Sequence, residues 1–281
     1  MATKTGTGFS VNKNTDSAVS EAWKLASKKL DGKQAGFIFT FVSTSHDYKK
    51  VLEKIKGLSG TSNIVGCSTA GEFTESNAST GGLSIMAISS DSIRFSMEKV
   101  TDVKHENFKS IADSVFGNYK DEARKMLADG FQNQTIFVLT DGFMTNRDEL
   151  IKDIYAKTGI SSQLVGGSAG DDVKFTRTDV FFGTESLTNA LVFVKAFSKN
   201  KIGVGVSHGM QPSSNAMRVT KSDGSKVYEL DGKLALDVYK EHAKSKGIEL
   251  TPENTSLYLI NNELGIKDLT FQKIRAPISA N

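Results

Sequence analysis

The amino-acid sequence predicts an α/β protein with mixed, largely covered β-sheets. We expect two duplicated β-α-β-hairpin halves, followed by a partial, smaller α+β C-terminal domain. Continuous apolar runs of strand length, rich in β-branched and aromatic residues, are typical of strands covered on both faces. Segments with apolar residues at helical spacing lie between these runs. A short glycine-rich turn occurs twice, beginning at Gly66 and again at Gly166.

Composition favours a protein that is soluble and buries a core. The chain has 281 residues, of which 38% are hydrophobic, and a mean hydropathy of -0.27. A net charge of +3 with dispersed lysines gives no basic stripe for nucleic acid, and no apolar run approaches the roughly 20 residues needed for membrane insertion. One cysteine permits no internal disulfide, and the polar N-terminus shows no export signal. We therefore expect a cytoplasmic protein.

The first half is expected to span about residues 19–128. Residues 1–18 are rich in Thr, Gly and Asn and predict a flexible lead-in, within which Asp16 or Ser17 begins a helix. The elements expected after that helix are a central strand at 35–42, a helix capped by Asp47, a strand at 63–66, a hairpin of 81–89 and 93–100, and helices at 108–116 and 119–127.

The second half is expected to span about residues 129–215 and to repeat this order. Its expected elements are a strand at 135–140, a helix from Asn146 or Asp148, and strands at 163–165, 179–182, 190–197 and 202–207. Four elements recurring in one order favour internal duplication. The alternative is that βα proteins often place glycines after strands.

The remaining residues, 216–281, predict the small C-terminal domain. Its expected elements are a turn at 219–224 that follows a strand, a strand at 227–230, a helix from residue 233 or 234 to about residue 244, and two further strands at 256–260 and 266–274.

The two glycine-rich turns are the candidate ligand site, because both follow strands and expose backbone N–H groups without bulky side chains. We expect them to line one cleft that receives a carboxylate or similar anion, with Asp171 or Asp172 binding an ammonium group. The candidate residues are Gly66, Cys67, Ser68, Thr69, Gly71, Gly166, Gly167, Ser168, Ala169, Gly170, Asp171 and Asp172. The alternative is structural, with glycines for positive φ or tight strand packing and serines capping local backbone.

A Cys67 nucleophile with His46 and Asp47 would make a hydrolase or transferase. Two observations oppose this alternative. His46 and Asp47 are adjacent, which hinders the carboxylate from orienting the imidazole, and a buried cysteine is more often a small hydrophobe. We therefore expect a binding protein and not an enzyme.

The two turns, together with three further motifs, resemble the FIST family of bacterial sensory domains. The further motifs are Ser207-His208-Gly209, Val219-Thr220-Lys221, and Glu229-Leu230-Asp231-Gly232 with Ala235. The resemblance covers residues 20–281 and implies a FIST N-terminal domain to about residue 215, followed by the start of the FIST C-terminal domain. Residues 275–279 resemble a segment from within that second domain, so we expect the sequence to stop partway through it.

The resemblance implies a non-enzymatic sensor of small ligands, including amino acids. It also implies a signalling partner such as a histidine kinase or a cyclic-dinucleotide enzyme. Some members resemble haem-binding nitric oxide sensors, so His208 is both a candidate ligand-binding residue and the leading candidate for a haem ligand. The other candidate iron ligands are His46, His105, His242 and Met210. The alternative for His208 is that its imidazole hydrogen-bonds backbone groups and fixes a turn.

Overall fold

The computed structural model describes residues 3–267, 272–277 and 279–280. The chain divides into two compact units, Met1–Gly205 and Val206–Asn281, with a boundary earlier than the one expected near residue 215. The α/β class predicted from the sequence is confirmed. Across the parts of the chain that the structure describes, no helix combines the length and the apolar character needed to cross a membrane.

The first unit contains two β-sheets. The six-stranded sheet consists of β1 (Lys4–Ser10), β6 (Leu83–Ser89), β2 (Phe37–Ser43), β3 (Ile64–Thr69), β10 (Val180–Phe182) and β11 (Glu185–Leu187), in that spatial order. The four-stranded sheet consists of β7 (Ile93–Val100), β12 (Leu191–Ser198), β8 (Asn133–Thr140) and β9 (Gln163–Ser168), also in spatial order. A short ribbon is formed by β4 (Glu72–Phe73) and β5 (Ala78–Ser79).

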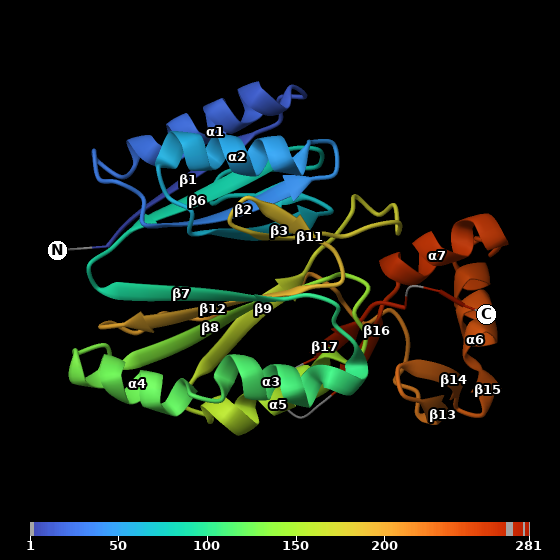
Figure 1. Ribbon diagram of the computed structural model, residues 1–281. Helices are drawn as coiled ribbons and strands as arrows, with labels where there is room; N and C mark the ends of the chain where they lie inside the picture. Colours follow the sequence, from blue (N-terminus) through green and yellow to red (C-terminus); the bar gives the residue numbers. More distant parts are fainter. Residues whose placement is uncertain (1–2, 268–271, 278, 281) are drawn as a thin grey trace. The chain divides into compact units, whose positions relative to one another are not determined.

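Helices cover the outer face of each sheet, so the first unit has four layers (Figure 1). The six-stranded sheet carries α1 (Thr15–Lys28) and α2 (Tyr48–Ser59). The four-stranded sheet carries α3 (Phe108–Phe116), α4 (Tyr119–Ala128) and α5 (Arg147–Thr158), with the short 3-10 helix His105–Asn107 before α3.

Side chains alternate between the two faces of each strand. Three apolar layers result, one between each sheet and its helices and one between the two sheets. On β2, Ile38 and Val42 face α1 and α2, whereas Phe37 and Phe39 face the other sheet. The Phe39 ring meets the ring of Phe137 from β8 at 5.1 Å between centroids. The apolar run at 35–42 therefore marks a strand buried on both faces, as predicted.

Four strands of each sheet share one topology. β1-β6-β2-β3 and β7-β12-β8-β9 have the same order, and in both the first two pairings are antiparallel and the last is parallel. The matching units run from β1 to β6 and from β7 to β12. Chain segments also cross between the sheets, because β10 and β11 lie beside β3.

The hairpin expected from residues 81–89 and 93–100 is wrong. Both segments are strands, but β6 pairs with β1 and β2 in one sheet while β7 pairs with β12 in the other. The short connection at 90–92 carries the chain between sheets. The local sequence of two strands and a turn is the same for a hairpin and for two strands that lie in different sheets. Only the strands with which they pair distinguish the two arrangements.

The flexible lead-in is also wrong for the described residues 3–18. Residues 4–10 form β1, paired along its length with β6, and α1 begins at Thr15 with Asn14 as its N-cap. The strand was missed because its buried positions are Gly6, Gly8 and Ser10, so it lacks the apolar alternation that predicts strands.

The second unit contains β13 (Val219–Asp223), β14 (Lys226–Leu230), β15 (Lys233–Leu234), α6 (Ala235–Ser245), α7 (Pro252–Asn261), β16 (Leu264–Lys267) and β17 (Gln272–Arg275). The strand expected at 256–260 is helical, because Pro252 begins α7 and Asn254 Oδ1 accepts from Thr251 N at 2.8 Å. Residues 202–207, expected as a strand, have no regular structure. The strand expected at 266–274 overlaps the β16-β17 pair, and its residues 268–271 lie outside the described residues.

Candidate functional site

The two glycine-rich turns contact each other directly. The backbone N–H of Gly170 donates to Ser68 O at 2.9 Å, and that of Asp172 donates to Thr69 O at 2.9 Å. A Cβ on Gly170 would lie 2.9 Å from Ala70 N, so only glycine allows this approach. The sequence predicted that the two turns line one ligand cleft, and that cleft stays a prediction. Two of the N–H groups expected to bind a ligand join the turns to each other.

The leading glycines hold neighbouring strands together. A Cβ on Gly66 would lie 1.7 Å from Thr40 O of β2, and a Cβ on Gly166 would lie 1.9 Å from Val138 O of β8. Neither glycine has positive φ. Of the structural roles considered for these glycines, tight strand packing therefore applies to both.

Asp171 organises the loop that follows the second turn. Its carboxylate is 4% exposed and accepts backbone hydrogen bonds from Lys174, Phe175, Thr176 and Arg177 at 2.6–3.1 Å. Burial opposes ionisation, but these four donors outweigh it and lower the pKa of Asp171. The carboxylate is thus engaged by its own loop.

Asp172 links this loop to the end of β2. Its Oδ2 accepts from Ser43 Oγ at 2.9 Å, Thr44 N at 2.8 Å and Thr44 Oγ1 at 2.5 Å. Its Oδ1 is buried and has no hydrogen-bond partner among the described residues. Of the two carboxylates proposed for an ammonium group, only that of Asp172 has an oxygen without a hydrogen-bond partner among the described residues, and that oxygen is buried.

The other predicted residues of the turns have local partners or none. Ser68 Oγ accepts from Asp179 N at 2.9 Å, and Thr69 Oγ1 donates to Glu72. In the second turn, Ser168 Oγ accepts from Thr140 Oγ1 at 3.0 Å, and Ala169 N donates to Thr140 O. Gly71 makes ordinary contacts with residues 79 and 80, whereas Gly167 faces open space.

Cys67 lies in the apolar layer between the two sheets. It is 5% exposed and contacts the cluster that includes Phe39, Val65 and Val180. Burial raises the pKa of its thiol to about 12. The thiol therefore stays protonated at neutral pH and is a poor nucleophile.

The proposed catalytic partners of Cys67 have other roles. His46 is buried, with Nδ1 3.3 Å from Thr15 Oγ1, and burial together with the nearby Lys13 charge lowers the pKa of its imidazole. Asp47 caps α2 by accepting from Lys50 N at 3.1 Å. Neither residue is arranged to activate a thiol.

The candidate haem ligands lie in separate local settings. His208 and Met210 are exposed in a stretch without regular structure, and His242 Nδ1 lies 2.8 Å from Tyr258 of α7. The side chain of His105 lies outside the described residues. Over the described ranges, no three or more His, Cys, Asp or Glu residues gather in a way that could hold a metal ion.

A pocket lies at the carboxyl end of β8, beside the joined turns. It has a volume of about 560 Å³, within the ~300–1,000 Å³ typical of small-molecule sites. None of the sequence-predicted site residues lines it. Its lining residues are Val103, Phe108, Asp141, Phe143, Met144, Thr145, Thr176, Arg177, Thr178, Thr188 and Asn189.

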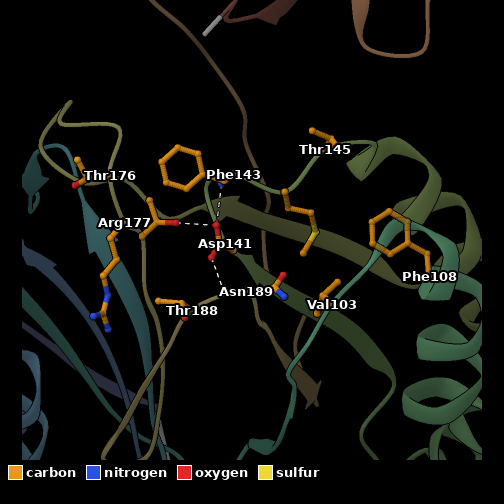
Figure 2. A pocket seen from close by; sticks show the side chains of 11 residues that line it. Val103, Phe108, Asp141, Phe143, Thr145, Thr176, Arg177, Thr188 and Asn189 are labelled. Atoms are coloured by element: carbon orange, nitrogen blue, oxygen red, sulfur yellow. Dashed lines mark hydrogen bonds between the residues drawn. The ribbon is translucent and has the colours of Figure 1, made fainter. Parts of the chain in front are cut away.

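Asp141 forms the polar centre of this pocket (Figure 2). Its Oδ1 accepts from Thr178 Oγ1 and Phe143 N, both at 2.8 Å, and its Oδ2 accepts from Asn189 N at 2.7 Å. Thr178 Oγ1 also accepts from Gly142 N at 2.9 Å. The carboxylate therefore joins three separate segments of the pocket wall.

The pocket has a polar and an apolar side. Figure 2 shows Arg177 and Thr176 on one side of Asp141 and Phe108 and Val103 on the other. Arg177 makes a bidentate pair with the fully buried Asp179, at 2.9 and 2.7 Å, which leaves Nη1 for a ligand. A small molecule with a carboxylate, an ammonium group and an apolar part would meet complementary groups here.

Haem does not fit this pocket. None of its lining residues is a histidine or a cysteine, and the Met144 thioether is its one customary haem ligand.

Sequence reasoning missed the pocket residues. Asp141 directly follows the strand expected at 135–140, and a carboxylate after a buried strand is a signal for a site at a sheet's carboxyl edge. Two loops supply Thr176, Arg177 and Asn189 to the pocket. Hydrogen bonds to distant residues position these loops, and no local sequence pattern predicts such bonds.

Comparisons with known proteins agree with the motifs. The family model for the FIST N domain matches residues 36–233. An uncharacterized protein of Methanocaldococcus jannaschii is 30% identical over 217 residues, which are 76% of this chain and 42% of that protein. The chain thus spans less than half the length of this relative.

Proposed function

Because the chain belongs to the FIST family, in which the FIST N domain is a sensory domain of signal transduction, we propose that it detects a small ligand in the pocket beside Asp141. The observation that carries this proposal is the pocket itself. It combines a volume suited to a small metabolite with charged groups of both signs and an apolar wall.

The ligand class we propose is an amino acid. Its ammonium group would donate to the one remaining lone pair of Asp141, on Oδ2. Its carboxylate would accept from the Arg177 N–H groups not used by Asp179. Phe108, Phe143 and Met144 would contact an apolar side chain. The lack of a haem-iron ligand other than Met144 in the pocket makes a haem-based gas sensor a weaker candidate, and the buried thiol of Cys67 disfavours a cysteine enzyme.

We propose that the glycine-rich turns report ligand binding in the pocket. The loop at 171–178 leaves the second turn, is held by Asp171, and supplies Thr176, Arg177 and Thr178 to the pocket. Ligand contact with these residues would change the loop, and through Asp172 the contact with Ser43 and Thr44. The direct ligand contacts predicted for the turns stay a prediction.

We further propose that the two matching units arose by internal duplication, which their common strand order and directions support. The signal would pass to a partner such as a histidine kinase or a cyclic-dinucleotide enzyme, the class that the family resemblance suggests. The protein would then be an intracellular receiver without catalytic activity of its own.

A thermal-shift screen with individual amino acids tests the proposal, since a ligand that binds the native state raises its stability. Phe143 lines the pocket and is 43% exposed, whereas Phe73 lies outside it and is 76% exposed. Phe143→Ala should weaken the shift, and Phe73→Ala is the matched control. A shift that both variants lose equally, or that neither loses, contradicts binding in this pocket.

A further inference from the structure

Residues 201–207 repeat the sequence pattern of β1. β1 reads Lys-Thr-Gly-Thr-Gly-Phe-Ser from Lys4 to Ser10, and residues 201–207 read Lys-Ile-Gly-Val-Gly-Val-Ser. The lysine, both glycines and the serine are identical and equally spaced. In the second segment, apolar residues alternate with the glycines, which is the period of a β-strand.

In β1, close packing against α1 requires glycine at both positions. A Cβ on Gly6 would lie 2.0 Å from Ala26 O, and one on Gly8 would lie 1.8 Å from Ala22 O, so α1 rests directly on the backbone of β1. Ser10, at the end of the pattern, donates its hydroxyl to Glu21 of α1 at 2.5 Å. The shared glycines and serine are therefore those that contact α1.

In residues 201–207, no close contact requires glycine at the two matching positions. A Cβ on Gly203 or Gly205 would meet nothing within 4 Å. Val204 is 37% exposed and Val206 is 91% exposed. Within the described residues, the backbone of this segment makes no hydrogen bond and belongs to no strand. A segment with a strand pattern, exposed valines and two unexplained glycines fits a conformation in which it is paired and covered.

Both segments start from the same corner of the first unit. Thr3 Oγ1 lies 2.6 Å from Ser90 Oγ and 2.9 Å from Ser92 Oγ, just before β1 begins. Lys199 N donates to Ser92 O at 2.9 Å, just before residues 201–207 begin. Each segment can therefore leave the connection at 90–92 in the direction that runs antiparallel to β6.

We propose that residues 201–207 are an alternative occupant of the β1 position in the same molecule. In the exchanged state they pair with β6 beneath α1, where Gly203 and Gly205 replace Gly6 and Gly8, and Ser207 replaces Ser10. After the exchange, Ile202, Val204 and Val206 take the places of Thr5, Thr7 and Phe9, of which Thr5 is exposed and the other two are half-buried. The exchange gives up the contacts of Thr7 with Glu75 and Lys29.

This exchange would be a conformational device of the fold. The second unit begins at Val206, so the segment that would occupy the β1 position is covalently continuous with that unit. The exchange does not depend on which ligand the pocket binds.

Disulfide trapping tests the exchange, in a Cys67→Ala background that removes the native thiol. Met86 of β6 lies opposite Thr7 in the present register and would lie opposite Val204 after exchange. The test variant is therefore Met86→Cys with Val204→Cys, and the matched control is Met86→Cys with Thr7→Cys. Directly opposite residues on antiparallel strands are close enough for a disulfide.

We expect the control to form an intramolecular disulfide quickly on mild oxidation, and the test variant to form one more slowly, as the exchanged state is visited. Adding Gly203→Val and Gly205→Val should slow the test disulfide at least tenfold, because each Cβ would strike α1, and should leave the control unchanged. Non-reducing electrophoresis and peptide mass mapping identify the products. No test disulfide beside a formed control, a rate insensitive to the valines, or disulfide-linked dimers would each overturn the proposal.

Discussion

The backbone N–H of Gly170 donates to the carbonyl oxygen of Ser68 at 2.9 Å. Ser68 is the next-to-last residue of β3 in the six-stranded sheet, and Gly170 follows β9 in the four-stranded sheet. This bond therefore joins the carboxyl ends of the two sheets main chain to main chain. The glycine-rich turns form a joint, and the pocket opens beside that joint.

The joint predicts a steric effect at Gly170. In Gly170→Val, the new Cβ would lie 2.9–3.2 Å from atoms of residues 69 and 70, so the turns must separate. We expect a loss of about 1–3 kcal/mol in the free energy of unfolding, measured by urea denaturation. Gly167→Ala is the control, because nothing lies within 4 Å of its Cβ; its effect should stay within about 0.5 kcal/mol. Equal losses in the two variants would argue against the joint.

The Asp171 carboxylate predicts a pH-dependent stability. Its pKa is lowered in the folded state, so its stabilising effect is complete above the unfolded pKa of ~3.9 and is lost as the pH falls through the folded pKa. Asp171→Asn should cost about 1.5–3 kcal/mol at pH 7, since it weakens hydrogen bonds to a charged acceptor, and less in acid. The measurement is urea unfolding from pH 3 to 7, with the exposed Asp91→Asn as control. A difference that does not shrink in acid would exclude this role.

Burial of Cys67 predicts a slow thiol reaction. With a pKa raised to about 12 and 5% exposure, the native protein should react with a thiol reagent at pH 8 far more slowly than the unfolded chain. Labelling followed by absorbance, with and without urea, measures the ratio. Comparable rates in both states would mean that the thiol is accessible and ionised, which would revive the cysteine-enzyme alternative.

Removing the buried ammonium group of Lys195 should lower the stability of the fold. Its side chain is 9% exposed and lies 2.7 Å from Glu98 and 3.1 Å from Glu122. Lys195→Met should reduce stability by about 1–3 kcal/mol in chemical denaturation, less than a fully buried pair because both carboxylates keep solvent contact. Lys4→Met removes an exposed pair with Asp31 and should cost less than about 1 kcal/mol. Equal losses of stability in the two variants would show that the burial of Lys195 does not strengthen its ion pairs.

Much of the fold could be predicted because buried strands have recognisable apolar and aromatic runs in the local sequence. The aromatic run at 35–42 and the run at 135–140 indicate strands covered on both faces, and both are central strands. The N-cap Asp47 marks the start of α2. By contrast, β1 buries glycines, and β6 and β7 differ from a hairpin only in their distant pairing partners. These features depend on tertiary contacts and leave no local periodicity.

The candidate site was predictable in part. Repetition of the glycine-rich turn indicated that the two copies act together, and they meet through Gly170 and Ser68. The pocket was not predictable, because Asp141, Arg177 and Asn189 come from three segments that a hydrogen-bond network brings together. Their residue types are common in loops, so no single motif identifies them.

The most direct test of ligand binding in the pocket is the change in melting temperature with each amino acid. An amino acid present at 100 times its Kd should add about 2.7 kcal/mol of stability, which is several degrees for a protein of this size. We expect at least one amino acid to raise the melting temperature of the wild type and of Phe73→Ala. We also expect Thr188→Trp, which fills the pocket from an exposed lining position, to abolish the increase. No increase with any amino acid, or an increase that Thr188→Trp leaves intact, would contradict the account.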